Sequence, residues 1–386
     1  MTTTNTTPTF SASARQSSRI GGLDLARGLA ILGMFWAHTT AYEPYGFFDG
    51  WLAQIPDGRS AVLFALLAGV SVALMTGRQE PYIGEQMKAA RLRIVGRALL
   101  LFFLGSLLSS LNTPVVVILG FYGFWLMLAL PLTSLPVRTL VWAAGIAAVA
   151  GPLLLIVVKS AMAASGLFVG ADPNSAFFAV MISGTYPGLQ YGVFVIAGLA
   201  IGRSDLLNRV RQLRLLAGGL VLAIGGYGLS YLATGGENTI PQHMPWDPIN
   251  SLLAREGGER SLSGSIGWVF PSVGEFFSAE PHSGMLLETI GSGGFAIAVL
   301  GACLLIGSTA RHVLYPLAAM GSMPLTSYCA HVVVIYVVPD AEEALTLLPF
   351  ITIAATTMLV ASLWKLKFSR GPLEWLAWRS GLLFTM

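Results

Sequence analysis

The feature that most constrains this chain is a series of long apolar segments, each close to the length that crosses a bilayer. A helix needs about 20 consecutive apolar residues to span the hydrocarbon core. The runs 141–158, 215–232 and 285–306 approach or exceed that length. Charged residues make up only 11% of the chain and hydrophobic residues 54%, whereas soluble domains carry about 25% charged residues. The sequence therefore predicts an all-α, polytopic integral membrane protein.

The same runs predict about ten transmembrane helices with both termini in the cytoplasm. The orientation follows from the positive-inside rule, because roughly 17 of the Lys and Arg residues then fall on the inner side. We expect a disordered cytoplasmic tail at 1–18, a transmembrane domain at 19–367 with an outer loop at 235–283, and a C-terminal cytoplasmic amphipathic segment at 368–386. The predicted spans are 23–42, 60–76, 94–111, 115–131, 139–160, 186–202, 215–233, 285–306, 318–338 and 344–364.

Several classes of site are disfavoured by the sequence. Cys303 and Cys329 lie inside apolar runs, so we expect buried thiols rather than a disulfide or a metal site. The sequence lacks a Gly-rich phosphate loop, zinc-type Cys and His spacing, and a Gly-x-Ser-x-Gly elbow. We therefore predict no bound metal, no nucleic-acid partner and no soluble-type cofactor domain.

Three ionisable residues lie in or beside the first predicted span: Asp24, Arg27 and His38. Ionisable groups within membrane helices are expensive, and they are candidate functional residues by default. Arg27 and His38 are eleven residues apart, which at about 100° and 1.5 Å per residue places them on one helix face, about 16 Å apart. Arg27 is then near the inner surface and His38 near the outer end.

This spacing fits an acyl-CoA, whose phosphates and thioester are separated by an extended arm. Arg27 could bind a phosphate or a polar group of the arm, and His38 could take the proton of an acceptor hydroxyl as a general base. Purely structural roles are the alternative. Arg27 could pair with Asp24 and reach the headgroups, while His38 could cap the helix or contact a headgroup.

A basic segment precedes the third predicted span and contains Arg91, Arg93 and Arg97. We interpret it as an inner loop whose guanidinium groups could hold the nucleotide end of CoA. Ordinary anchoring to anionic lipid is the alternative. The second basic cluster, from Arg203 to Arg214, has the same two interpretations.

The Arg27-x10-His38 spacing resembles the first-helix pattern of membrane acyltransferases that modify glycans. The segment 22–30 resembles the first helix of heparan-α-glucosaminide N-acetyltransferase-like proteins and their bacterial relatives, and the later segments 281–291, 323–331 and 370–375 fit that bacterial branch. The resemblance extends from residue 19 to residue 379. It implies a transmembrane acyltransferase that uses acetyl-CoA, and a mycolate-glycolipid acetyltransferase is one member of this class that it allows.

The resemblance also places His331 beside the acyl-binding cavity, with a core histidine as the structural alternative. His282 could assist the acceptor, or could cap the eighth span with Ser283 and Glu288. One departure is clear: the lysosomal enzyme has its catalytic histidine in the loop after the first helix and an asparagine at the position of His38, whereas the loop 39–57 has no histidine here. We therefore assign the base to His38.

We expect an O-acetyltransferase in the bacterial plasma (inner) membrane that moves an acyl group from cytosolic acyl-CoA to a sugar hydroxyl of an outer-leaflet glycan or glycolipid. Trehalose mycolate is the acceptor if the host makes mycolate glycolipids. The expected partners are acyl-CoA, the glycan or glycolipid acceptor and membrane lipids. A transporter or flippase of a lipid-linked or small-molecule substrate is the alternative, because many apolar spans with scattered glycines also suit alternating access.

Overall fold

The computed structural model describes residues 20–39, 55–164, 181–182, 185–236, 273–307, 312–338 and 347–384. Within these ranges the regular elements are all helices, which confirms the predicted all-α class. In chain order they are α1 (Gly21–Thr39), α2 (Arg59–Met75), α3 (Gly84–Ser109), α4 (Leu119–Ala129), the 3-10 helix η2 (Leu130–Ser134), α5 (Val137–Ala164), α8 (Gly188–Gly202), α9 (Arg209–Thr234), α11 (Val273–Phe276), α12 (Leu286–Ile306), α13 (Tyr315–Gly321), α14 (Pro324–Val337), α15 (Leu348–Lys367) and α16 (Pro372–Leu383).

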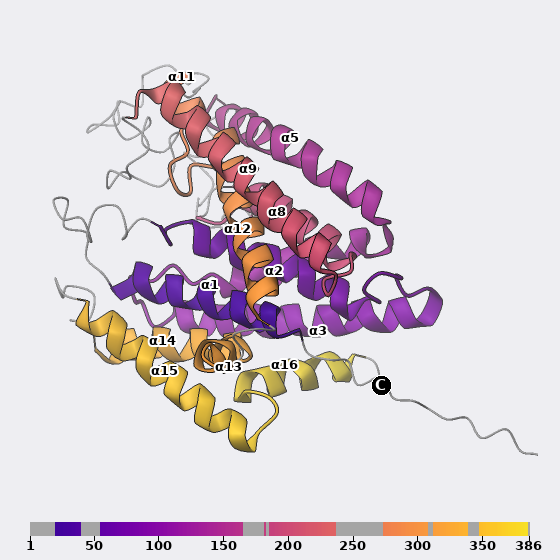
Figure 1. The fold of residues 1–386 in the computed structure, drawn as a ribbon, viewed down its shortest axis with the longest axis vertical. Coiled ribbons are helices and arrows are strands. Elements are labelled where there is room, and N and C mark those ends of the chain that lie inside the picture. Colours follow the sequence, from indigo (N-terminus) through magenta and orange to yellow (C-terminus); the bar gives the residue numbers. More distant parts are fainter. Residues whose placement is uncertain are drawn as a thin grey trace, which may run out of the picture.

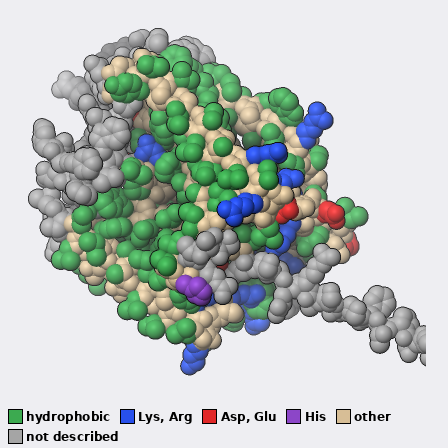
Figure 2. Space-filling view, viewed as in Figure 1, with side chains coloured by type: hydrophobic (Ala, Val, Ile, Leu, Met, Phe, Trp, Pro, Cys, Tyr) green, Lys and Arg blue, Asp and Glu red, His purple; other side chains and the backbone are tan. Residues whose placement is uncertain are grey.

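The surface has the character of a membrane protein. Among the described helices, five are long and apolar enough to cross a bilayer, and a sixth qualifies if α13 and α14 form one span. Large apolar side chains are exposed along α9, including Val221 at 70% and Leu232 at 78%. Figure 2 shows a largely hydrophobic face, with most Lys and Arg side chains gathered towards the right of the view. The chain is therefore a multi-pass membrane protein, whereas the count of ten spans remains a prediction.

The centre of the fold is built by close contacts between helix backbones. Figure 1 shows α5 and α9 along the upper side of the view, α15 and α16 along the lower side, and α1, α2 and α12 between them. Gly69 of α2 and Gly198 of α8 face each other so closely that a Cβ at either position would overlap the other helix's backbone. Small residues of this kind let membrane helices pack tightly. They hold α2 and α8 in close contact at the centre of the fold.

The ninth predicted span, 318–338, is not one continuous helix. It consists of α13 and α14, which meet at an angle of 88°. Pro324 is the first residue of α14, and Met323 before it has φ −132° and ψ 59°, outside the helical region. Proline disfavours the helical conformation in the residue that precedes it, and it cannot donate a helical hydrogen bond. The predicted span is therefore a bent pair of helices, and whether the pair crosses the membrane as one span stays a prediction.

The basic segment before the third span is also different from the prediction. It is not a loop, because α3 begins at Gly84 and already contains Arg91, Arg93 and Arg97. Alanine, lysine and arginine are strong helix formers, so the helix continues beyond the apolar stretch. The helical conformation divides these arginines between two faces, which matters for the site described below.

The predicted orientation can be tested by cysteine labelling. Both native cysteines are buried, so a membrane-impermeant maleimide should react only with an introduced thiol. Because residues 13 and 261 belong to segments predicted inside and outside, Ser13→Cys should be labelled only after the membrane is permeabilised, and Ser261→Cys in intact cells. Labelling of both from the same side would contradict the predicted topology.

Candidate active site

Two histidines from distant parts of the chain meet at the end of α1. His38 Nδ1 lies 3.0 Å from His331 Nε2 of α14, and the two ring planes are nearly parallel. His331 is 1% exposed and also contacts the rings of Phe35 and Tyr328. The fold thus brings together the two histidines that the sequence singled out as candidates in separate helices.

The hydrogen bonds of this pair define which nitrogen carries each proton when both rings are neutral. His331 Nδ1 lies against the backbone carbonyl of Tyr328, and a carbonyl oxygen can only accept. Nδ1 therefore carries the proton of His331, and its Nε2 accepts from His38 Nδ1. His38 is then left with an unprotonated Nε2, which is the atom that a general base needs.

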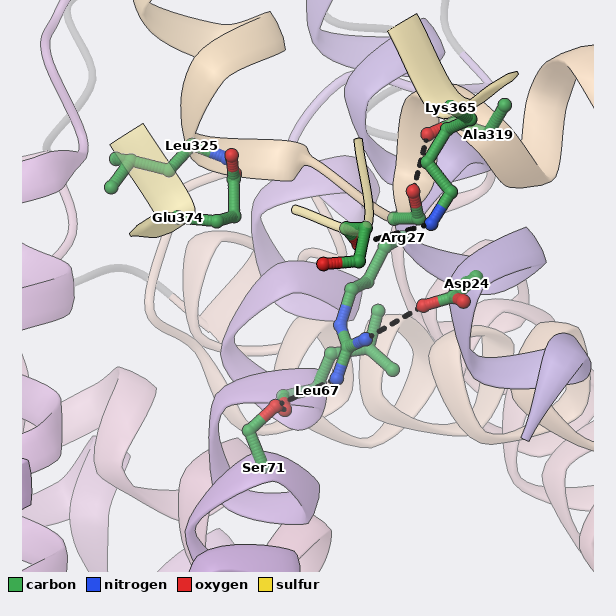
Figure 3. Close-up of polar contacts among 10 residues, drawn as sticks. Asp24, Arg27, Leu67, Ser71, Ala319, Leu325, Lys365 and Glu374 are labelled. Atoms are coloured by element: carbon green, nitrogen blue, oxygen red, sulfur yellow. Dashed lines mark hydrogen bonds and ion pairs between the residues drawn. The ribbon is translucent and has the colours of Figure 1, made fainter. Parts of the chain in front are cut away.

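Arg27 lies further along the same helix towards its other end. Its guanidinium donates to the Asp24 carboxylate at 3.0 Å and to Ser71 Oγ of α2 at 3.0 Å, as Figure 3 shows. The ion pair with Asp24 expected under the structural alternative is therefore present. The side chain is nevertheless 21% exposed, so a part of it remains accessible to a ligand.

The positive charges that act on Arg97 come from three segments. Arg97 of α3 lies within electrostatic range of Arg27, Arg93 and Arg370. Arg91 instead donates to Thr133 Oγ1 and Ser134 Oγ of η2. Residues four apart share a helix face, whereas residues two apart do not. The predicted group of Arg91, Arg93 and Arg97 is therefore divided between two helix faces, and Arg97 is the member within electrostatic range of Arg27.

The second basic cluster also contains a side chain with an evident structural role. Arg203 is 2% exposed, and its guanidinium donates to the carbonyl oxygens of Thr76, Arg78 and Thr133. These bonds hold the end of α2 and η2 against the end of α8. The interpretation of Arg203 as a phosphate ligand is therefore disfavoured by its contacts.

His282 lies just before α12, close to Asp57 and Tyr191. Its Nε2 is 3.7 Å from Asp57 Oδ1, and its Nδ1 is 3.3 Å from the hydroxyl of Tyr191. His282 has a φ of 64°, a conformation uncommon for residues other than glycine. Asp57 is also within electrostatic range of His38. The carboxylate thus interacts with both histidines.

A buried carboxylate was missed as a candidate by the sequence analysis. Glu288 of α12 is 0% exposed, accepts from Gln190 Nε2 at 2.7 Å, and accepts from Ser292 Oγ at 3.2 Å. It was interpreted only as part of a helix cap, but α12 has no side-chain cap bond at its N-terminus. The available signal was an acidic residue inside an apolar run, which by itself marks a functional candidate.

The C-terminal helix supports the helix that carries His331. Glu374 of α16 accepts from the backbone N–H groups of Leu325 and Thr326 and from the Thr326 hydroxyl, and Figure 3 includes its contact with Leu325. A carboxylate at a helix N-terminus satisfies otherwise unpaired N–H groups and interacts well with the helix dipole. The predicted C-terminal segment is thus part of the structure around the site.

Two models of known protein families match this chain. A family model described as heparan-alpha-glucosaminide N-acetyltransferase, catalytic, matches residues 19–218. A second, described as protein of unknown function (DUF418), matches residues 261–385. No curated protein matches the chain. His38 and Arg27 fall within the first match, and His331 and His282 within the second.

Proposed function

Because the chain belongs to the heparan-alpha-glucosaminide N-acetyltransferase catalytic family, we propose that it moves an acetyl group from cytosolic acetyl-CoA to a hydroxyl on the outer side of the membrane. The family establishes an acetyltransferase-type membrane enzyme. The donor, the direction of transfer and the acceptor are parts of the proposal. A sugar hydroxyl of an outer-leaflet glycan or glycolipid, such as trehalose mycolate, is the proposed acceptor, and a bacterial inner membrane the proposed location.

The main support for the proposal is that α1 holds both the cation Arg27 and the candidate base His38. His38 has its Nε2 available as a base because the contact with His331 occupies its Nδ1. Arg27 lies on the same helix, within electrostatic range of Arg97, where phosphate groups would be stabilised. A donor with its nucleotide among these arginines would extend along the helix towards the histidine pair.

The residues support a direct transfer. His38 Nε2 takes the proton of the acceptor hydroxyl while the oxygen attacks the thioester carbonyl carbon. The new C–O bond forms, the C–S bond breaks, and the CoA thiolate leaves with the electron pair. The proton held by His38 then neutralises the thiolate, so the ring returns to its starting state. His331 acts as a positioning residue because it holds the required tautomer of His38.

Purified protein in lipid nanodiscs tests the function directly. With acetyl-CoA labelled in the acetyl group, the wild type should release CoA thiol and transfer label to an added glycolipid. A protein that binds acetyl-CoA but neither hydrolyses it nor transfers the acetyl group would contradict the proposal.

A transporter remains the second candidate, and the break between α13 and α14 favours it. Discontinuous helices are common at transporter substrate sites. Proteoliposomes distinguish the two, because a transporter would accumulate an unmodified sugar or glycolipid across the membrane, whereas an acetyltransferase modifies it.

Reversal of one charge tests the donor side. Arg93→Glu places a negative charge beside Arg97 and should weaken CoA binding by about tenfold or more, since hydrogen bonds between charged groups contribute about 1.5–3 kcal/mol. Binding of CoA to nanodiscs is the measurement. Arg138→Glu, at the exposed start of α5, is the matched control. Unchanged CoA affinity in Arg93→Glu, together with reduced protein abundance, would identify the cluster as a topology anchor.

A further inference from the structure

A buried carboxylate near the start of α12 has no part in the transfer described above. Glu288 is 0% exposed. Its Oε2 accepts from Gln190 Nε2 at 2.7 Å and its Oε1 from Ser292 Oγ at 3.2 Å, so both oxygens accept, as in an ionised carboxylate. Ionisable groups within membrane helices are expensive and commonly serve function. The polar groups connected to Glu288 indicate what that function is.

Two hydroxyl groups connect Glu288 to the cation Arg59. Ser292 Oγ lies 3.0 Å from the Tyr227 hydroxyl, and Arg59 Nε donates to the same hydroxyl at 2.7 Å. A serine hydroxyl has a single proton. Because Ser292 donates this proton to Glu288, it accepts from Tyr227. Each donor in the chain therefore points from Arg59 towards Glu288, and the two charges form an ion pair bridged by two hydroxyl groups.

Arg59 also fixes the turn that precedes α2. Its Nη1 donates to the carbonyl oxygen of Ile55 at 3.2 Å, and its backbone N–H donates to the carbonyl oxygen of Asp57 at 2.6 Å. Gly58 has a φ of 64°, and a Cβ at this position would come within 2.9 Å of the Pro281 side chain. The turn is thus held from both sides, and it carries the carboxylate of Asp57.

Asp57 is the charge in this turn that bears on proton transfer. Its Oδ1 lies 3.7 Å from His282 Nε2, and the carboxylate is within electrostatic range of His38. When His38 takes the proton of the acceptor hydroxyl, it becomes an imidazolium, and a nearby carboxylate stabilises that positive charge. Because the interaction depends on the distance between the two charges, Asp57 must be held in place.

We propose that Glu288 is a positioning residue for the acetyl transfer. Through the hydroxyl-bridged ion pair with Arg59, it fixes the turn that holds Asp57. Asp57 in turn stabilises the imidazolium that His38 becomes. The inference rests on the proposed function, because it explains how the base is supported during that reaction. Neither carboxylate takes up the proton, which passes from the acceptor hydroxyl to His38 and then to the CoA thiolate.

Tyr227→Phe tests the proposal by removing one bridging hydroxyl. The aromatic ring, over which the Arg59 guanidinium lies at 4.7 Å, is kept. We expect kcat to fall by up to about 10²-fold, because small displacements near a reacting group can cost that much. The donor KM should stay near the wild-type value. Tyr231→Phe removes a hydroxyl from the same helix at a residue that is 58% exposed, and this matched control should keep the wild-type kcat.

Combined variants test whether Glu288 acts through Asp57. Asp57→Asn should lower kcat by itself, and Tyr227→Phe should have little further effect in that background, because both substitutions act on the same charge. Glu288→Gln should behave like Tyr227→Phe. If Glu288→Gln lowers the yield of folded protein, Tyr227→Phe still decides the matter, because it leaves the buried carboxylate in place. Wild-type kcat in Tyr227→Phe, or losses of kcat that multiply in the double variant, would overturn the inference.

Hydrogen exchange separates the inference from the function on which it rests. The backbone amides of residues 55–60 should exchange faster in Tyr227→Phe than in the wild type or in Tyr231→Phe, because the turn loses its connection to Glu288. Unchanged exchange in this segment would overturn the positioning role whatever the activity. A wild type that neither hydrolyses acetyl-CoA nor transfers the acetyl group, but whose turn responds to Tyr227→Phe, would refute the acetyltransferase proposal and leave the connection between Glu288 and the turn established.

Discussion

Replacement of His38 by glutamine is expected to lower acetyl transfer by about 10²- to 10⁴-fold, which is the usual contribution of a positioned general base. Glutamine keeps a polar side chain near His331 but provides no basic nitrogen. Donor binding should stay near the wild-type value because the arginines that would hold the nucleotide are unchanged. Steady-state kinetics with labelled acetyl-CoA, together with CoA binding to the same preparation, measures both quantities.

Two companion variants make this result specific. Arg27→Ala should mainly raise the donor KM, because a phosphate contact stabilises the ground state and the transition state alike. His331→Gln removes the ring that holds the tautomer of His38, so kcat should fall while the donor KM is retained. Near-normal transfer by folded His38→Gln would show that its imidazole is not the base, and His331 and His282 would become the next candidates.

Replacement of Gly198 by valine is expected to prevent stable folding. A Cβ at this position would overlap the carbonyl of Leu66, and this backbone atom cannot move away unless α2 and α8 separate. Overpacking typically destabilises by about 1–3 kcal/mol and occasionally by more. We expect the free energy of unfolding to fall by an amount at or above the upper end of that range, because the contact is with backbone at the centre of the fold. Thermal unfolding and the yield of monodisperse protein are the measurements.

Gly218→Val is the matched control for this substitution. It introduces the same side chain into α9 at an exposed position, where a Cβ would meet nothing within 4 Å. Its melting temperature should stay close to that of the wild type. Comparable yield and melting temperature for Gly198→Val would show that α2 and α8 do not pack as closely as described.

The helices could be predicted because bilayer-length apolar runs leave little choice of conformation. The break before Pro324 had a local signal, the proline itself, that the hydropathy pattern concealed. The early start of α3 also had a local signal, which is the helix-forming residues around Arg91. Both differences arise because the apolar length of a segment does not report such local conformational preferences.

The candidate site was predictable only in part. The common face of Arg27 and His38 follows from helical periodicity, whereas the contact between His38 and His331 joins residues 293 positions apart and depends on how α1 and α14 pack. Most of the predicted outer loop, residues 237–272, lies outside the described residues, so its placement stays a prediction. The resemblance to the acetyltransferase family is confirmed by the matching family model.

The bond between Glu374 and the start of α14 has a consequence for control of the enzyme. His331 lies six residues beyond Leu325, whose N–H group donates to Glu374. The C-terminal helix therefore holds the start of α14, the same helix that carries His331. Truncation of the chain before α16, or a protein that draws α16 away, would leave the N–H groups of this element without their acceptor. A change at the C-terminal helix would then reach His331 through α14, with no regulator entering the site.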